Sequence, residues 1–292
     1  MEADSASGRA ACWAGALPIR FALAADEVTT LHPPPPIHAV VPRHALLPLV
    51  IGRVREHFAA FAPPLGGQMW LEYGETPLRW QLPVGVVFDL LAGAEAEAQL
   101  PWELTVRFQR FPAEEVASGA AADAEATLLN ALKEATCVQC GSALPVMTLP
   151  PELTQKLVAA VVAGRHDDFE PVRAEVRRRA LGQLRGGGSG GGDEALAMKA
   201  VPARVHTSQR DWRELAMPPT LDDGSPRRLR HLLASLLPQH FGEAEGEAAT
   251  APPPTVLVQG VAVPLDSPLA WLADACAHAD GFLYVVVRGL PP

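Results

Sequence analysis

Lysine is rare in this chain, and its amine is the first group that could do covalent chemistry. Three of the 24 basic residues are lysines, namely Lys133, Lys156 and Lys199, and all the others are arginines. This excess of arginine, with abundant alanine, glycine and proline, is typical of a coding bias rather than of one function. Arginine can replace lysine on most solvated surfaces, but it cannot act as a primary amine nucleophile. Amine chemistry is therefore available to three side chains.

Cys137 and Cys140 are separated by two residues, a spacing that metal ligands and redox-active thiols share. A structural zinc site needs about four ligands, and His166 is a lone further candidate on another expected segment. A thioredoxin-like site needs a strand before the motif and a helix beginning in it, whereas we expect this pair to follow a helix and to precede a loop. We favour ordinary loop thiols, with a metal or redox role as the alternative, and predict no metal and no other cofactor.

A glycine-rich run at residues 186–192 imitates two catalytic motifs. Residues 187–191 satisfy G-x-S-x-G, but a nucleophile elbow needs a strand before the serine and a helix after it. The Gly-Lys-Ser/Thr end of a phosphate loop does not follow either. We therefore interpret the run as a flexible linker and predict no catalytic residue in the chain.

The densest basic patch contains five arginines on, or directly after, an expected helix at residues 169–184. They are Arg173, Arg177, Arg178, Arg179 and Arg185. We favour a solvated helix face on which the arginines pair with nearby acidic residues, namely Asp167, Asp168, Glu170 and Glu175. The alternative is a transient contact with anionic lipid headgroups.

Two blocks of the sequence repeat one order of elements. The order is helix, strand hairpin, helix and closing strand. In the first block we expect these elements at residues 44–61, 69–73 with 78–82, 83–92, and 104–109. In the second block we expect them at residues 228–237, 255–259 with 263–265, 267 onward, and 282–287. Candidate first strands precede the two blocks at residues 17–24 and 203–207.

The duplication extends to single residues. In each block the proline that begins the second helix is followed six residues later by an aspartate, Pro83 by Asp89 and Pro268 by Asp274. Three further helices are expected between the blocks, at residues 124–135, 153–163 and 169–184. The expected fold is α+β, with two ubiquitin-like (β-grasp) domains that flank a helix-rich domain. The expected divisions are residues 13–112, 113–185, a Gly/Ser linker at 186–194, and 195–290.

The strongest motifs lie in the first block. The run MWLEYGETPLRW at residues 69–80 is followed by Pro-Val-Gly at 83–85, Phe-Asp-Leu-Leu at 88–91 and Leu-Pro-Trp at 100–102. Near the C-terminus, residues 268–272 read PLAWL. With these motifs the chain resembles the autophagy protein 5 family from about Trp13 to Val287. The resemblance implies the same architecture as the duplication, namely two ubiquitin-like domains around a helix-rich one.

The resemblance also implies a role for Lys133, which stands in a Lys-Glu-Ala context. In the family such a lysine accepts the ubiquitin-like modifier autophagy protein 12 through an isopeptide bond. The family also binds the N-terminal helix of autophagy protein 16 without a covalent bond. The resulting assembly acts like an E3: with E2-like enzymes as transient partners, it promotes transfer of the autophagosomal ubiquitin-like protein to phosphatidylethanolamine. This chain would then be an acceptor and scaffold rather than an enzyme, joined into a higher assembly by the coiled-coil partner.

Two alternatives to this function stay open. One is a ubiquitin-like-domain adaptor that binds a coiled-coil partner without being conjugated. The other is a cysteine transferase or metalloprotein built on Cys137 and Cys140. Four tryptophans, Trp70, Trp80, Trp102 and Trp271, lie beside expected strands and helix starts. We favour core packing for most of them, with a partner-helix groove as the alternative.

Composition excludes several other classes. The formal net charge of −9 argues against naked nucleic acid as a partner, since phosphates are bound by a positive surface. The apolar runs fall far short of the roughly 20 residues that cross a bilayer. The N-terminus has neither the basic nor the apolar region of a signal peptide. We expect a cytoplasmic protein, and the resemblance implies a peripheral association with the pre-autophagosomal (phagophore) membrane.

Overall fold

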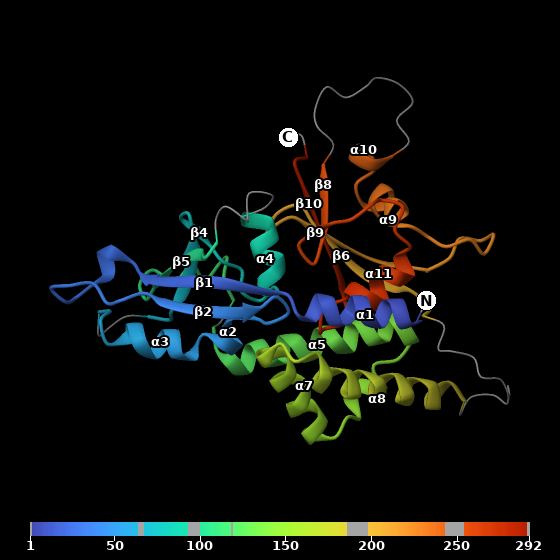
Figure 1. Cartoon of the computed structure of the whole chain (residues 1–292), viewed down its shortest axis with the longest axis horizontal. Coiled ribbons are helices and arrows are strands. Elements are labelled where there is room, and N and C mark those ends of the chain that lie inside the picture. Colours follow the sequence, from blue (N-terminus) through green and yellow to red (C-terminus); the bar gives the residue numbers. More distant parts are fainter. Residues whose placement is uncertain are drawn as a thin grey trace. The chain divides into compact units, whose positions relative to one another are not determined.

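The computed structural model describes residues 2–63, 67–92, 100–117, 119–185, 198–242 and 254–290. The chain forms two compact units. The smaller unit comprises residues 14–127 and 162–164, and the larger unit comprises residues 1–13, 128–161 and 165–292. Figure 1 shows the helices and strands that are named below. The glycine-rich linker expected at residues 186–194 lies outside the described residues.

The smaller unit contains a mixed five-stranded sheet in the order β2-β1-β5-β3-β4. Strands β1 and β5 are parallel and the other pairs are antiparallel. This is the β-grasp arrangement that the sequence predicted. The strands are β1 (Ala16–Leu23), β2 (Ile37–Pro42), β3 (Trp70–Tyr73), β4 (Thr76–Pro77) and β5 (Trp102–Arg107); the helices are η1 (Ala25–Glu27), α2 (Leu47–Val50), α3 (Gly52–Ala59) and α4 (Val84–Leu91).

The core of the smaller unit lies between this sheet and its helices. Along β1 and β5 every second side chain is buried, which is the pattern of a sheet with one covered face. Helix α4 presents an almost continuous apolar sequence and is buried over six of its eight residues. The largest fully buried side chains of this core include Trp80, Trp102 and Phe58.

Two predicted elements of the smaller unit differ from the structure. The helix expected at residues 44–61 is two helices, because Ile51 leaves helical geometry between α2 and α3. Pro48 fits only the first turn of a helix and Gly52 favours a break, which explains the late start and the division. The returning strand expected at residues 78–82 is wrong: the hairpin pairs at β4, and Trp80 then turns into the core, where its indole donates to the Ala117 carbonyl at 2.9 Å.

The larger unit contains a second sheet of the same topology, in the order β7-β6-β10-β8-β9 with β6 and β10 parallel. The shared order of strands confirms the duplication inferred from the sequence. Its strands are β6 (Val201–His206), β7 (Trp212–Met217), β8 (Thr255–Val258), β9 (Val261–Ala262) and β10 (Leu283–Arg288); its helices are α9 (Leu229–Leu236), α10 (Pro238–Phe241) and α11 (Leu269–Cys276). Strand β9 lies two residues earlier than the expected strand 263–265.

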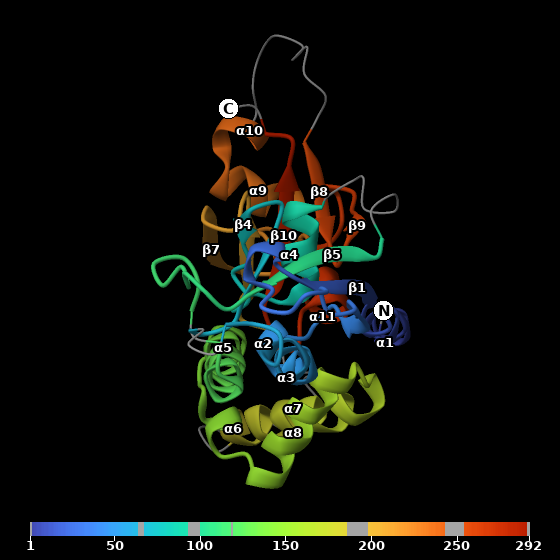
Figure 2. The ribbon, with the colours of Figure 1, turned by 90° about the vertical axis from the view of Figure 1, so that its left-hand side faces the viewer.

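The helices that lie between the two sheets in the sequence are α5 (Ala121–Cys140), α6 (Leu144–Met147), α7 (Pro151–Ala163) and α8 (His166–Arg185). The three long ones confirm the expected helices, and all three are longer than predicted. In both views α7 and α8 run beside one another (Figures 1 and 2). Among the described residues, no helix is both long enough and apolar enough to cross a bilayer.

The sequence did not predict α1 (Glu2–Trp13), which belongs to the larger unit. It lies alongside α11 in both views (Figures 1 and 2). The helices that begin after Pro83 and Pro268 also differ in detail from the prediction. Each proline is the residue before the first helical one, and neither helix has a side-chain cap hydrogen bond.

Candidate functional site

Lys133 lies on the solvent-facing side of α5. It shares that side with Asn130 and Cys137, which are exposed and stand one helical turn to either side. The Lys133 side chain is partly exposed, and its Nζ donates a hydrogen bond to Asn130 Oδ1 at 3.1 Å. This partner is a neutral amide rather than a carboxylate. The amine can therefore leave it for an incoming electrophile without breaking an ion pair.

The opposite side of α5 holds the helix in place. Leu128, Leu132 and Ala135 recur at helical spacing and are buried. Gly281, in the turn before β10, packs against this side: a Cβ built on it would lie 3.0 Å from the Ala135 Cβ. Gln139 Nε2 also donates to the Gly281 carbonyl at 3.0 Å. The second β-grasp domain thus positions the part of α5 that carries Lys133.

A charged network continues from α5 into the second sheet. Glu134, the neighbour of Lys133, pairs with Arg204 on β6 at 3.3 Å. Arg204 also donates to the hydroxyl of Tyr284 at 3.1 Å, and that hydroxyl donates to Asp280 at 2.7 Å. Burial raises the pKa of Asp280 and raises the pKa of Tyr284. The network links Glu134 to the core of the domain through Arg204. Arg204, rather than Lys133, is therefore the cationic partner of Glu134.

The other two lysines lie elsewhere in the larger unit. Lys156 is exposed on α7. Lys199 lies against the end of α5, where its backbone amide donates to the Gln139 carbonyl at 2.9 Å. A Cβ built on Gly141 would meet Lys199 Nζ at 2.5 Å, so this amine is folded over the end of the helix. The two lysines offer internal controls for a claim about Lys133.

Cys137 and Cys140 do not lie in a loop as the sequence predicted. Both belong to the last turn of α5, because the helix extends five residues beyond its expected end. Cys137 is exposed, whereas Cys140 is half-buried and burial raises the pKa of its thiol. Among the described residues, no group of three or more His, Cys, Asp or Glu side chains could hold a metal ion.

The arginines of α8 are paired, as the favoured interpretation predicted. Arg178 donates two hydrogen bonds of 2.7 Å to Glu175 and Arg179 donates one of 2.7 Å, and these hydrogen bonds lower the pKa of Glu175 to about 2. Arg173 binds Glu170 at 2.9 Å, and both Arg173 and Arg177 also turn towards Asp274 on α11, a partner that the sequence did not suggest. The side chain of Arg185 lies outside the described residues. This pairing leaves little basic charge for an anionic surface.

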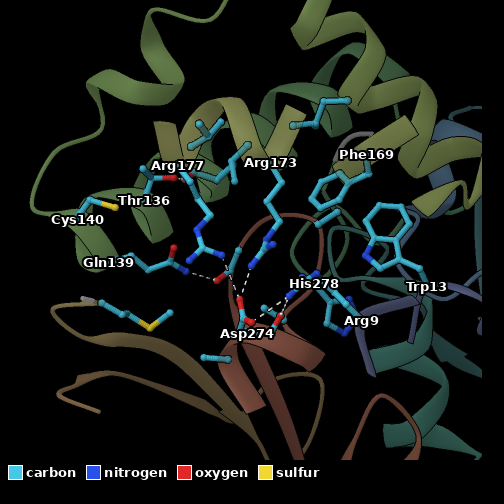
Figure 3. Close-up of a pocket in the computed structure, with 18 residues that line it drawn as sticks. Arg9, Trp13, Thr136, Gln139, Cys140, Phe169, Arg173, Arg177, Asp274 and His278 are labelled. Atoms are coloured by element: carbon cyan, nitrogen blue, oxygen red, sulfur yellow. Dashed lines mark hydrogen bonds and ion pairs between the residues drawn. The ribbon is translucent and has the colours of Figure 1, made fainter. Parts of the chain in front are cut away.

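Asp274 is the centre of an ion-pair cluster beside a cavity of about 110 Å³ in the larger unit (Figure 3). Arg9 of α1 approaches the Asp274 carboxylate at 3.1 Å and the carboxylate of Glu170 at 3.3 Å. Arg173 joins the same two acids. At the apolar end of the cavity, Phe169 packs on Trp13 with ring centroids 4.3 Å apart. Burial alone would raise the pKa of Asp274, but a hydrogen bond from Ser5 and the charges of Arg173 and Arg9 lower it.

Sequence reasoning missed the α1 half of this cluster. The Pro-to-Asp spacing singled out Asp274, but its partner Arg9 lies 265 residues away. The sequence of α1 shows no clear apolar period, because the residues that face α11 are small or polar. Trp70, Trp80 and Trp102 are buried, which confirms core packing for them, and Trp271 is partly exposed. A groove for a partner helix stays a prediction.

Family models match the chain in three segments. Residues 12–108 match the model described as "Autophagy protein ATG5, UblA domain", and residues 200–287 match the UblB domain of the same protein. Residues 122–177 match its "alpha-helical bundle region". Along the sequence, the helix-rich region therefore stands between the two ubiquitin-like domains. Together they account for most of the chain.

Whole proteins and a solved structure show the same likeness. An autophagy protein 5 of Neosartorya fischeri is 28% identical over 98% of this chain and 96% of its own length. An autophagy protein 5 of Oryza sativa subsp. indica is 33% identical over 59% of this chain, and the match spans only 45% of that relative. The crystal structure of Kluyveromyces marxianus Atg5 covers 97% of this chain and 99% of its own, with a TM-score of 0.73 at 21% identity. At that identity the structural likeness shows the fold alone.

Proposed function

Because this chain belongs to the autophagy protein 5 family, we propose that it acts in autophagy as an acceptor and scaffold, with Lys133 as its conjugation site. The observation that carries the proposal is the match of three family models in order along the chain. The position of Lys133 supports it, since its partly exposed amine lies on a helix that is held from its other side. The modifier is the ubiquitin-like autophagy protein 12.

The proposed reaction is an aminolysis. The uncharged amine of Lys133 attacks the carbonyl carbon of a thioester that joins the modifier's C-terminal glycine to an E2-like enzyme. A C–N bond forms, the C–S bond breaks, and the enzyme's thiol leaves. The amine's proton passes to a base. In this scheme the chain supplies the nucleophilic amine and the surface around it, while the conjugating enzymes supply the reactive cysteines.

The conjugate would then work as part of a larger assembly. We propose that it binds the N-terminal helix of autophagy protein 16 and acts like an E3 for lipidation. It would promote transfer of the autophagosomal ubiquitin-like protein from its thioester to phosphatidylethanolamine. The proposed location is the cytoplasm, with peripheral contact to the phagophore membrane. The paired arginines of α8 give no support to that helix as the membrane contact.

Reconstituted conjugation tests the site. The purified chain is incubated with autophagy protein 12, its E1-like and E2-like enzymes and ATP, and the adduct is digested for mass spectrometry. We expect a branched peptide at Lys133 and loss of the adduct in Lys133→Arg, which keeps the charge but removes the amine. Lys156→Arg with Lys199→Arg is the matched control, and this double variant retains Lys133 as its one lysine. Conjugation of Lys133→Arg at the wild-type rate would show that the site is wrong.

A second candidate function follows from the same experiment. If the wild-type chain gains no modifier yet co-purifies with the coiled-coil partner, it is a non-conjugated adaptor with ubiquitin-like domains. The observation that favours conjugation over this adaptor is the Lys-Glu-Ala context of Lys133, in a chain where lysine is rare. Arginine occupies nearly every basic position, but an amine stands at position 133 on an exposed helix side.

A further inference from the structure

We propose that Cys12 of α1 and Cys276 of α11 form a reversible disulfide that fastens the N-terminal helix to the second β-grasp domain. This inference is independent of conjugation at Lys133 and concerns a different pair of helices. It rests on how closely the two helices approach, on the position of the two thiols between them, and on the difference in burial between those thiols.

One side of α1 is fitted to α11. The residues on that side are Ser5, Gly8, Arg9 and Cys12, which recur at helical spacing. A Cβ built on Gly8 would lie 3.2 Å from the Ala275 Cβ and 3.5 Å from the ring of Trp271. The absence of a side chain at Gly8 therefore lets the two backbones approach. The hydroxyl of Ser5 donates to the Asp274 carboxylate at 2.6 Å, which fixes the register of the pair.

The two thiols meet at the end of this contact. Cys12 is one turn beyond Gly8 on α1, and Cys276 follows Ala275 as the last residue of α11. Cys276 belongs to the apolar core of the second β-grasp domain, and Cys12 packs against that core. The two thiols are in hydrogen-bonding contact with each other. A disulfide requires neighbouring backbones and facing side chains, and the close helix contact supplies both.

The two cysteines have unequal surroundings, and this gives them different parts in the reaction. Cys276 is buried, and its contact with Cys12 together with burial raises the pKa of its thiol. Cys12 is only partly buried and faces an incoming oxidant first. The thiolate is the nucleophile in thiol–disulfide exchange, so the more accessible Cys12 attacks and Cys276 resolves the intermediate.

The oxidant in the proposal is a low-molecular-weight disulfide such as oxidised glutathione. The Cys12 thiolate attacks one glutathione sulfur, the S–S bond of the oxidant breaks, and one glutathione leaves as its thiolate. The Cys276 thiol then loses its proton, attacks the Cys12 sulfur, and releases the second glutathione. In total, two protein thiols are oxidised to one disulfide and one glutathione disulfide is reduced to two thiols.

The consequence concerns α1 alone. In the reduced chain the helix is held by packing and by the ion pairs of Arg9, which salt screens only in part because Arg9 is buried. In the oxidised chain it is also held by a covalent bond between positions 12 and 276. The disulfide would keep α1 on the second β-grasp domain under conditions in which the ion pairs are weak.

Oxidation of the full chain tests the proposal. The background variant is Cys137→Ser with Cys140→Ser, because these two thiols lie one turn apart on α5 and could be oxidised separately. It is treated with oxidised glutathione and mapped by mass spectrometry without reduction. We expect a peptide that joins Cys12 to Cys276, a mass lower by two hydrogens, and reversal by dithiothreitol. Hydrogen exchange of residues 2–13 in about 1 M salt should slow about tenfold after oxidation.

Single variants in the same background separate the two steps. Cys276→Ser should stop at a stable mixed disulfide between glutathione and Cys12, and Cys12→Ser should resist oxidation at Cys276. The proposal is overturned if the background variant keeps both thiols, or if it holds glutathione on Cys12 without closing the ring. It is also overturned if the disulfide forms but the exchange of α1 does not change.

Discussion

At the scale of single residues, Asp89 and Asp274 occupy equivalent positions in the two β-grasp domains but bind different partners. Asp89 on α4 lies in the first β-grasp domain and binds Arg43 of the same domain at 2.5 Å. Both side chains are buried, and Arg43 also donates to the Gly85 carbonyl at 3.3 Å. A buried charge that loses its partner is strongly destabilising, whereas an exposed pair contributes little. The Arg43–Asp89 pair should therefore be essential to the smaller unit.

Asp89→Asn tests this expectation. The substitution keeps the shape of the side chain but leaves the Arg43 guanidinium buried without a counterion, so unfolding of the smaller unit should become easier by about 3–5 kcal/mol. Urea unfolding can be followed by tryptophan fluorescence, because Trp70, Trp80 and Trp102 all report on this unit. Glu103→Gln, which removes the exposed partner of Arg20, is the control and should change stability by about 1 kcal/mol or less. Equal effects of the two substitutions would contradict the argument.

At the scale of elements, Gly281 determines how α5 sits on the second β-grasp domain. Its φ of +83° is unfavourable for any other residue, and a Cβ there would press on Ala135. Gly224 has almost the same φ, +81°, but a Cβ there would meet nothing within 4 Å. Both Gly→Ala variants should lose about 1 kcal/mol through the backbone. Only Gly281→Ala should also loosen α5, by roughly 1–3 kcal/mol.

Hydrogen exchange of residues 128–140 measures this second effect. The amides of α5 should exchange faster in Gly281→Ala and at the wild-type rate in Gly224→Ala. The comparison separates the close contact from the φ strain, since the strain is common to both variants. If the α5 amides exchange at the same rate in the two variants, the contact with Ala135 does not hold the helix.

Helix α8 carries an acid-sensitive contact of its own. Hydrogen bonds from two arginines, Arg178 and Arg179, lower the pKa of Glu175 to about 2 from a usual 4.5. A carboxyl whose folded pKa is depressed stabilises the fold above its unfolded pKa, and the stabilisation is lost as the pH falls. The contribution of Glu175 should therefore be complete above about pH 4.5 and absent below about pH 2. An NMR titration of the Glu175 carboxyl checks the midpoint, and in Glu175→Gln the acid-dependent loosening of α8 over this range should disappear.

The elements also show what the sequence could and could not predict. The hairpins, the proline-started helices and the closing strands have clear apolar periods or turn residues, so both β-grasp domains could be predicted. Strand β2 lies at the edge of its sheet and exposes Val40, while β7 exposes Trp212, so neither has the alternation of a half-buried strand. Helix α1 uses Gly8 and Ser5 for its contact, which no apolar period reveals. Lys133 could be chosen from the three lysines because its Lys-Glu-Ala context resembles that of the family, whereas Cys137 was misplaced when the end of α5 was set too early.

At the scale of the whole chain, duplication produced two copies of one fold with different neighbours. In the first copy the helix aspartate, Asp89, is satisfied inside its own domain. In the second copy Asp274 is satisfied by Ser5 and Arg9 from α1 and by Arg173 from α8. A single ancestral position thus became the point at which a helix from the start of the sequence and a helix from its middle join the second β-grasp domain.

Asp274→Asn should release α1 from this contact. The substitution removes the charge that Arg9 and Arg173 share and leaves only Glu170 for them, so α1 should open more often by about 1–3 kcal/mol, or roughly 5- to 150-fold. Hydrogen exchange of residues 2–13 reports this opening directly, with β10 as an internal reference for the core of the domain. Asp266→Asn removes an exposed ion-pair acid from the same unit and should leave α1 unchanged. If α1 and β10 accelerate together, Asp274 stabilises the domain as a whole; if α1 alone accelerates, the second aspartate serves to dock the N-terminal helix.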